Sequence, residues 1–158
     1  MRLEYFQMLD RIVDVDVGER RIRTACTIPK ANESPIFEGH FPGYPLMPGV
    51  LLIECMAQTT GWLASALANF DIMPILAGVK EAKMRSAVFP GDELEFEGKV
   101  IHEGSGYAIG EAKGWSKGKP ICDATLTYRI VPYPSKEMRE GLWEWADRIN
   151  FPAREYAK

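Results

Sequence analysis

The longest apolar segment of the chain, residues 50–70, constrains the fold more than any other feature. It reads VLLIECMAQTTGWLASALANF and is apolar on nearly all faces of a helix. A helix that is apolar all round is buried on all sides. At about 1.5 Å per residue it would extend over roughly 31 Å, so we expect the other elements to pack around it. Pro48 and Gly49, just before it, suit the beginning of a helix.

A segment of this length could also cross a membrane, for which roughly 20 residues are needed. However, Glu54 and Gln58 lie inside the segment, and Gly61 interrupts it. We therefore predict a helix buried within a protein and no membrane span. The first residues, MRLEYFQMLDRIV, contain an acidic side chain by position 4 and no apolar core, so no signal peptide is expected.

Strand-like segments flank this helix on both sides. Before it, residues 12–17 and 20–28 alternate apolar and polar side chains around a turn, as a hairpin does. After it, turn-forming residues separate four more segments of strand character: 75–79, 93–101, 107–115 and 121–130. The simplest way to bury both kinds of element is an α+β fold, with a curved antiparallel sheet wrapped around the one long helix.

The C-terminal region, residues 132–158, differs from the rest. Met138, Leu142, Trp145 and Ile149 recur at helical spacing, which predicts an amphipathic helix. We expect one domain at residues 1–131 with this helical extension packed on it.

The composition argues against several classes of protein. With 158 residues and a net charge of −3, the chain has no excess of basic residues that would favour nucleic acid. Its three cysteines, Cys26, Cys55 and Cys122, form no CxxC pair, which indicates free thiols in a reducing cytoplasm. No cluster of His, Cys and Asp has the spacing of metal ligands, so no metal is expected.

One histidine and one glutamate are the candidates for proton transfer. His40 lies in a loop rich in proline and glycine, and Glu54 lies in the apolar helix. Histidine exchanges protons near neutral pH, and an apolar setting favours the protonated form of glutamate, which can act as an acid. The backbone N–H groups of Gly49 and Val50, at the start of the helix, are placed to polarise a carbonyl oxygen.

Together these groups suit removal of a proton from the carbon next to a carbonyl, with loss of a hydroxyl from the following carbon. His40 would be the base, and Glu54 would protonate the departing hydroxyl. Taken singly, a buried histidine is more often a structural hydrogen-bond partner, and a lone helix glutamate is usually solvated. Their combination in one short segment is what indicates a site.

Residues 39–58, GHFPGYPLMPGVLLIECMAQ, resemble the signature of the β-hydroxyacyl-acyl-carrier-protein dehydratases of the FabZ type. In that family a histidine in a GHFP motif and a glutamate in a PGVLxxExxAQ motif carry out the dehydration, and they match His40 and Glu54. Shorter matches are LDRI at residues 9–12, LAGVKEAKMR at 76–85 and PGDEL at 90–94. The resemblance covers roughly residues 5–130.

The resemblance implies a hotdog fold, which agrees with the strand–helix–strand order above. It also implies a homodimer, often assembled as a hexameric trimer of dimers, in which the histidine of one subunit and the glutamate of its neighbour share a tunnel. The partner would be an acyl carrier protein, whose phosphopantetheine arm carries the substrate, and no other cofactor is expected. Related dehydratase-isomerases usually have aspartate at the acidic position, so Glu54 favours dehydration without isomerisation.

Two features depart from the typical member of the family. The approach to the first strand is shortened to EYFQMLDR, and the region from Pro132 onward is longer. Both resemble a branch in certain Gram-negative bacteria that makes very long hydroxylated acyl chains for lipid A on a specialised carrier protein. The extension then has three possible roles: packing on the sheet, covering a long acyl chain, or contacting the carrier.

Further residues are expected at the site. Gln58 lies one helical turn after Glu54 and would hold its carboxyl group. Lys80, Lys83 and Arg85 would attract an acidic carrier protein, although a solvated strand edge explains them equally well. The expected substrate contacts are Phe41, Pro48, Gly49, Val50, Gln58 and Phe89, of which Phe89 would line the acyl tunnel.

These observations predict a cytoplasmic (3R)-3-hydroxyacyl-carrier dehydratase of fatty acid biosynthesis that forms a trans-2-enoyl thioester. Two alternatives stay open on the sequence: a hotdog thioesterase that acts on the same substrates, and a non-catalytic hotdog subunit that binds acyl carriers. An intact acid and base disfavour the second alternative.

Overall fold

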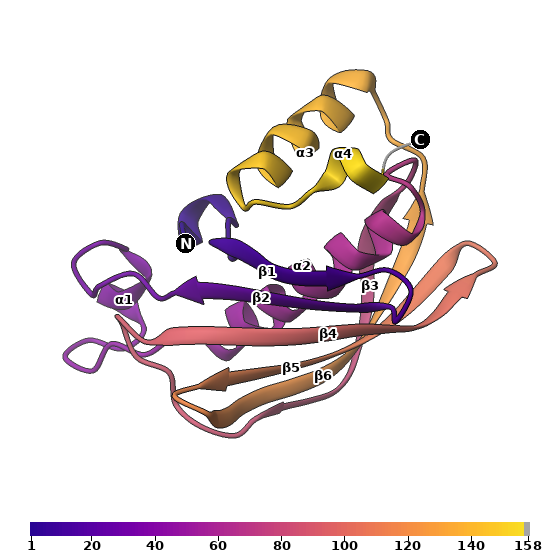
Figure 1. The fold of residues 1–158 in the computed structure, drawn as a ribbon. Helices are drawn as coiled ribbons and strands as arrows, with labels where there is room; N and C mark the ends of the chain where they lie inside the picture. The colour runs from indigo at the N-terminus through magenta and orange to yellow at the C-terminus, as the bar shows by residue number, and fades with distance from the viewer. Residues whose placement is uncertain (157–158) are drawn as a thin grey trace.

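The computed structural model describes residues 1–156 and consists of a curved antiparallel sheet wrapped around one long helix (Figure 1). The six strands lie in the order β1-β2-β4-β5-β6-β3. They are β1 (Arg11–Asp16), β2 (Arg21–Thr27), β3 (Met73–Met84), β4 (Glu93–Gly104), β5 (Tyr107–Ser116) and β6 (Lys119–Val131). The helical elements are η1 (Leu3–Tyr5), α1 (Ile36–Gly39), α2 (Gly49–Leu67), α3 (Lys136–Arg148) and α4 (Ala153–Tyr156). The predicted α+β hotdog architecture is confirmed.

The helix α2 and the sheet share one apolar core. Met56 and Leu63 of α2 are fully buried, as are Phe96 of β4 and Leu126 of β6. Although α2 has the length and hydropathy of a membrane-spanning helix, 61% of its apolar window is buried inside the fold. The apolar character of α2 is therefore explained by the sheet that covers it.

Polar groups buried between α2 and the sheet are paired. The hydroxyl oxygens of Thr59 and Thr24 lie 2.8 Å apart. Tyr128 of β6 donates its hydroxyl hydrogen to the carbonyl oxygen of Ala57 at 2.9 Å, and Thr60 bonds to the same hydroxyl. Burial raises the pKa of Tyr128 far above its ordinary value, so this phenol stays neutral and serves as a structural hydrogen-bond partner.

Two glycines allow the strands to approach α2 closely. A Cβ atom at Gly98 of β4 would lie 2.6 Å from Thr60 Cγ2, and one at Gly110 of β5 would lie 2.8 Å from Thr60 Cβ. Both distances are shorter than any ordinary carbon–carbon contact. The spacing between the helix and the sheet therefore depends on the absence of side chains at these two positions.

Replacement of Gly98 by Ala is expected to lower the free energy of unfolding by about 1–3 kcal/mol, because the new methyl group must displace Thr60 and the packed core around it. Urea unfolding of the purified variant measures this. The matched control is Gly141→Ala in α3, where a Cβ atom would have nothing within 4 Å; it should stabilise by about 0.5–1 kcal/mol through helix propensity alone. Equal destabilisation by both changes would contradict the packing argument.

The end of α2 differs from the expectation. The sequence predicts a helix to residue 70, but α2 ends at Leu67. Asn69 and Phe70 both have positive φ values, 52° and 57°, and the Phe70 N–H donates to the Ser65 carbonyl oxygen at 2.8 Å. This turn places the fully buried Phe70 ring beside Trp62. Burial of that ring in the core, which the helical pattern does not reveal, decides where the helix ends.

The strand β3 is longer than predicted, with twelve residues from Met73 to Met84 instead of 75–79. The other five strands match their predicted ranges to within three residues. β3 lies at one edge of the sheet and pairs with β6. Its side chains are mostly exposed, including Ile75, Leu76 and Val79. Because most side chains of this edge strand are exposed, apolar and polar residues alternate only weakly along it. The sequence pattern therefore predicted only part of β3.

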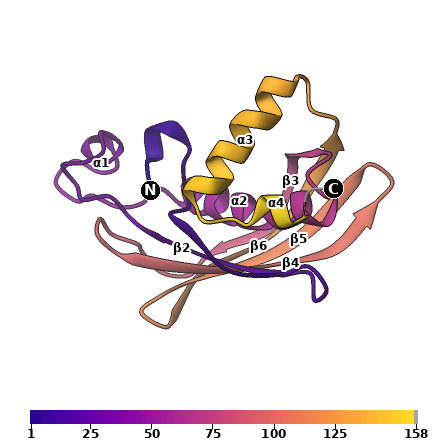
Figure 2. The ribbon, with the colours of Figure 1, turned by 45° about the horizontal axis from the view of Figure 1, so that its top comes forward.

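The C-terminal extension packs on α2 at the side that the sheet leaves open. α3 begins after Ser135, whose hydroxyl oxygen accepts from the Met138 N–H at 3.2 Å. Its Trp145 ring meets the Trp62 ring of α2 edge to face, at 5.6 Å between centroids, and Phe151 stacks on Trp62 at 5.5 Å. Figure 2 shows α3 and α4 on the same side of the sheet as α2. The apolar side of α3 thus contacts mainly α2, and the sheet is met at its edge, where the Ile12 N–H of β1 donates to the Ile149 carbonyl oxygen at 2.7 Å.

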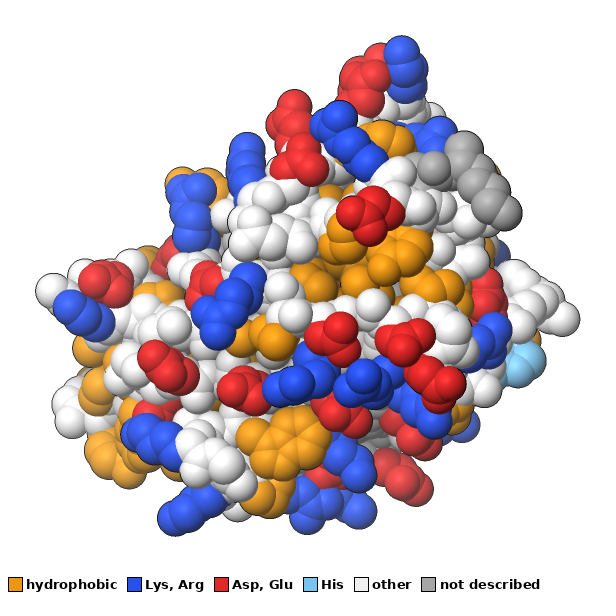
Figure 3. Space-filling view, in the orientation of Figure 1, with side chains coloured by type: hydrophobic (Ala, Val, Ile, Leu, Met, Phe, Trp, Pro, Cys, Tyr) orange, Lys and Arg blue, Asp and Glu red, His pale blue; other side chains and the backbone are white. Residues whose placement is uncertain are grey.

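Charged side chains of both signs are intermixed on the face shown in Figure 3. Three ion pairs join side chains on and near β1, β2 and β4: Arg20–Glu103, Arg21–Asp14 and Arg23–Glu95. Each pair is solvated and contributes little to stability. No large region of a single sign is present on this face.

Candidate active site

His40 follows the short helix α1, in the loop that leads to α2. Its Nδ1 lies 2.8 Å from the carbonyl oxygen of Leu46. Because a carbonyl oxygen only accepts, Nδ1 donates the hydrogen, and the neutral ring keeps its lone pair on Nε2. The Leu46 N–H in turn donates to the His40 carbonyl oxygen at 2.8 Å, so Leu46 holds both the backbone and the ring. Nε2 is the atom available to accept a proton.

Aromatic side chains surround this loop. The Phe41 ring stacks on the His40 imidazole at 4.1 Å between centroids. Tyr44 meets Phe89 edge to face at 5.8 Å. Phe41 and Phe89, both predicted to contact substrate, therefore belong to the loop region around His40 and are partly exposed there.

Glu54 lies in the second turn of α2 and is half-buried. Gln58 Nε2 donates to Glu54 Oε1 at 2.9 Å and also to the carbonyl oxygen of Phe6 at 2.6 Å. Gln58 Oε1 accepts from the Met8 N–H at 3.2 Å. The contact between Gln58 and Glu54 follows the helical spacing predicted from the sequence, and Gln58 also anchors the shortened N-terminal segment to α2.

Replacement of Gln58 by Leu is expected to lower the free energy of unfolding by about 1–3 kcal/mol, because the Phe6 carbonyl and the Met8 N–H lose their shared partner. It should also lower kcat more than it raises KM if Glu54 acts in the reaction, since the carboxyl group loses the bond that orients it. Urea unfolding and steady-state kinetics on the same preparation measure both effects. Gln7→Leu, a change of the same type in the adjoining segment, should leave kcat within about twofold of wild type.

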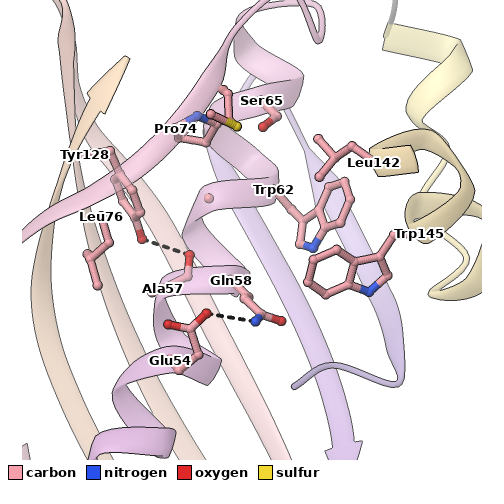
Figure 4. Close-up of a pocket in the computed structure, with 12 residues that line it drawn as sticks. Glu54, Ala57, Gln58, Trp62, Ser65, Pro74, Leu76, Tyr128, Leu142 and Trp145 are labelled. Carbon is pink, nitrogen blue, oxygen red and sulfur yellow. Dashed lines mark hydrogen bonds between the residues drawn. The ribbon is translucent and has the colours of Figure 1, made fainter. Parts of the chain in front are cut away.

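Glu54 lines a pocket of about 160 Å³ that lies between α2, β3, β6 and α3 (Figure 4). Its lining is mainly apolar and consists of Glu54, Ala57, Gln58, Gly61, Trp62, Ser65, Met73, Pro74, Leu76, Tyr128, Leu142 and Trp145. Figure 4 shows Glu54 and Gln58 at one end, with Trp62 and Trp145 next to each other farther along. The pocket thus joins an ionisable group to an apolar groove.

The structure does not bring all predicted site residues together within one protomer. Glu54 and Gln58 line the pocket, whereas His40 and Phe89 do not. The pocket of Glu54 within one protomer therefore does not include the candidate base, and a site shared between subunits stays a prediction.

The first turn of α2 has the free N–H groups expected there. Pro48 supplies no side-chain cap, and its carbonyl oxygen accepts from the N–H groups of Leu51 and Leu52 at 3.0 and 3.4 Å. The N–H groups of Gly49 and Val50 have no backbone acceptor within residues 1–156. They are available to a carbonyl oxygen, as helix N-termini generally are.

The predicted carrier-binding residues lie on or directly after β3. Lys80, Lys83 and Arg85 are all exposed, and Arg85 forms an ion pair with Asp123 of β6. Exposure is compatible with a carrier contact and equally with a solvated edge.

The three cysteines are free and buried. Burial raises the pKa of the Cys55 thiol well above its ordinary value and raises that of Cys122 to about 12. A neutral, buried thiol is a poor nucleophile, so Cys55 is a core residue despite its position beside Glu54.

Sequence reasoning missed most of the pocket wall. Trp62 lies eight residues after Glu54 and four after Gln58, on the same face of α2, so helical spacing alone identifies it in retrospect. Tyr128, Leu142 and Trp145 come from β6 and α3. No local signal connects them to Glu54, because only the folded chain brings them near.

Comparison with known proteins places the chain in a family. A sequence model of the FabA-like domain matches residues 2–125. A relative from Shewanella oneidensis, named 3-hydroxyacyl-[acyl-carrier-protein] dehydratase FabZ, is 41% identical over 128 residues, covering 77% of this chain and 80% of its own. A FabZ dehydratase from Koribacter versatilis is 38% identical over 131 residues, covering 82% of each chain.

Solved structures agree on the fold. A conserved protein of Pseudomonas aeruginosa matches with a TM-score of 0.63 at 20% identity, over 80% of this chain and 93% of that one. A hypothetical thioesterase of Streptococcus pneumoniae, solved with coenzyme A, matches with a TM-score of 0.61 at 15% identity, over 79% and 88%. At such identities the likeness shows the fold alone. The sequence matches are closer, and by them the chain belongs to the FabA-like domain family, as a relative of the FabZ dehydratases.

Proposed function

We propose that this chain is a (3R)-3-hydroxyacyl-[acyl-carrier-protein] dehydratase, a hydro-lyase of fatty acid biosynthesis. His40 Nε2 takes a proton from C2 of the acyl chain, and Glu54 gives a proton to the C3 hydroxyl, which leaves as water. The thioester oxygen gains negative charge during the step and is stabilised by the N–H groups of Gly49 and Val50. The product is a trans-2-enoyl thioester.

The observation that carries this proposal is the hydrogen bonding that prepares each group for its role. Leu46 leaves the lone pair of His40 on Nε2, as a base requires. Gln58 donates to Glu54 Oε1 and leaves Oε2 free to carry the proton of an acid. The names of the relatives at about 40% identity support the same reaction. No cofactor beyond the phosphopantetheine arm is proposed, because two side chains account for both proton transfers.

The site is proposed to be shared between two copies of the chain in a homodimer, with a trimer of dimers as the larger assembly. Ile75, Leu76, Val79 and Met84 expose apolar surface along the free edge of β3. Pairing of two such edges would bury them. Because β3 also lines the pocket of Glu54 through Leu76, a second copy at this edge would stand beside that pocket and bring its His40 toward Glu54.

An acyl carrier protein is the proposed partner. Lys80, Lys83 and Arg85 offer positive charge on and after β3, and acidic carriers would be attracted to it. Phe41, Pro48 and Phe89 are proposed to contact the arm or the first carbons of the acyl group, since they belong to the loops around His40. A cytoplasmic location, and a role with the long or very long acyl chains of lipid A, are proposed from the resemblance of the N-terminal and C-terminal regions.

The test is an assay of the purified protein with 3-hydroxyacyl carrier protein, following absorbance of the enoyl thioester and release of free thiol in parallel. Enoyl product without thiol release is the expected result. Thiol release without enoyl product would make the protein a thioesterase. Tight carrier binding with neither product would make it a non-catalytic subunit.

A further inference from the structure

The extension after the family domain forms part of the pocket of Glu54. The FabA-like match ends at residue 125, whereas α3 spans Lys136–Arg148. Leu142 and Trp145 of α3 nevertheless line the same pocket as Glu54 and Gln58. A wall of the candidate site is therefore made by residues that the family domain does not include.

The pocket follows one face of α2 away from the carboxyl group. Glu54, Gln58, Gly61, Trp62 and Ser65 all line it, and their spacing places them along one helix face. From Glu54 to Ser65 the helix rises by roughly 16 Å. The groove is therefore elongated, as Figure 4 also shows.

The side chains that line the pocket indicate which part of the substrate it binds. Glu54 must reach the C3 hydroxyl, so the carbons beyond C3 continue past it. Apart from Glu54 and Gln58, the lining is mainly apolar and includes Trp62, Leu142 and Trp145, with Ser65 and Tyr128 as the other polar side chains. An alkyl chain fits such a lining, whereas the polar pantetheine arm does not.

We propose that α3 completes the acyl-chain pocket and that Trp145 and Leu142 are specificity-determining residues for acyl-chain length. This inference rests on the proposed function and deepens it, because it assigns the distal part of the same site. The Trp145 ring packs edge to face against the Trp62 ring at 5.6 Å between centroids, so the two indoles form one continuous apolar wall of the groove. Long chains contact them, and short chains end near Glu54 before reaching α3.

The test compares Trp145→Ala with Trp143→Ala, the same change at a tryptophan two positions earlier on α3. Trp143 does not line the pocket and instead lies beneath Arg139 and Arg154. Each protein is assayed on 3-hydroxyacyl groups of increasing length, all on one carrier, and the ratio of kcat/KM for long and short chains is recorded. Each buried methylene contributes about fourfold to binding. Trp145→Ala should therefore lower the ratio about tenfold or more, while Trp143→Ala should leave it within about twofold.

A second variant covers the case in which Trp145→Ala fails to fold. Leu142→Trp fills the pocket without emptying the core, and it should lower kcat/KM for long chains about tenfold or more while leaving short chains unchanged. Unchanged dependence of kcat/KM on chain length in the folded variants, with dehydration intact, would overturn the role of α3.

If the wild type dehydrates no substrate, calorimetric titration with a long saturated acyl-pantetheine tests whether the acyl pocket exists. If the Trp145 or Leu142 variant binds this compound more weakly than the wild type does, the acyl pocket is supported although the proposed reaction is wrong. If the variants and the wild type bind it equally, the acyl pocket is wrong as well.

Discussion

Replacing Glu54 by Gln, or His40 by Ala, is expected to lower kcat for dehydration by about 10²–10⁴-fold, the usual contribution of a positioned acid or base. The amide introduced by Glu54→Gln would keep the shape of the side chain and could still accept from Gln58, but it has no acidic proton to donate to the leaving hydroxyl. The His40→Ala change removes the lone pair on Nε2. Single-turnover measurement of enoyl thioester formation gives the effect on the chemical step directly.

The stability of these variants separates a catalytic role from a structural one. Both side chains are only partly buried, so the free energy of unfolding should change by no more than about 1 kcal/mol. His102→Ala and Glu111→Gln, the same changes at positions outside the site, should keep wild-type turnover. Near-wild-type rates in either the His40 or the Glu54 variant would refute the assigned role of that residue.

Co-expression of the His40→Ala and Glu54→Gln chains is expected to restore roughly a quarter of wild-type turnover, if two copies share each site as in a twofold dimer. About half of the randomly paired dimers then contain one chain of each kind. In such a mixed dimer one site combines both defects, and the other combines the intact His40 of one chain with the intact Glu54 of the other. The prediction follows from the separation of His40 from the pocket of Glu54 within one protomer.

Differently tagged chains allow the mixed dimers to be isolated before the assay. Each variant expressed alone under both tags supplies the baseline. Mixed dimers that remain as inactive as the single variants would place the acid and the base within one protomer and exclude the shared site.

The fold of this chain is shared by proteins that carry different names. The dehydratases at about 40% identity and the hypothetical thioesterase at 15% identity share one fold with this chain. A shared fold alone therefore does not determine the reaction. The proposed proton transfers rest on the hydrogen bonds that orient His40 through Leu46 and Glu54 through Gln58.

The local patterns of the sequence were sufficient for the order of elements and for the candidate acid and base. The apolar run at residues 50–70 identified α2, and alternation located most strands, because these signals arise from neighbours along the chain. The contact between Gln58 and Glu54 was predictable for the same reason, since residues four apart share a helix face. The motif around His40 and Glu54 also placed both residues before any coordinates were known.

Other features were decided only by tertiary structure, because they arise between residues that are distant in sequence. Nothing near Gly98 in the chain indicates that Thr60 of α2 occupies the space beside it. Nothing near Glu54 indicates that Trp145, about ninety residues later, closes its pocket. The sequence by itself determined the order of the main elements and which groups are the candidates for the chemistry. The tertiary structure determined how closely those elements pack and what surrounds the carboxyl group, since packing depends on contacts that no local pattern records.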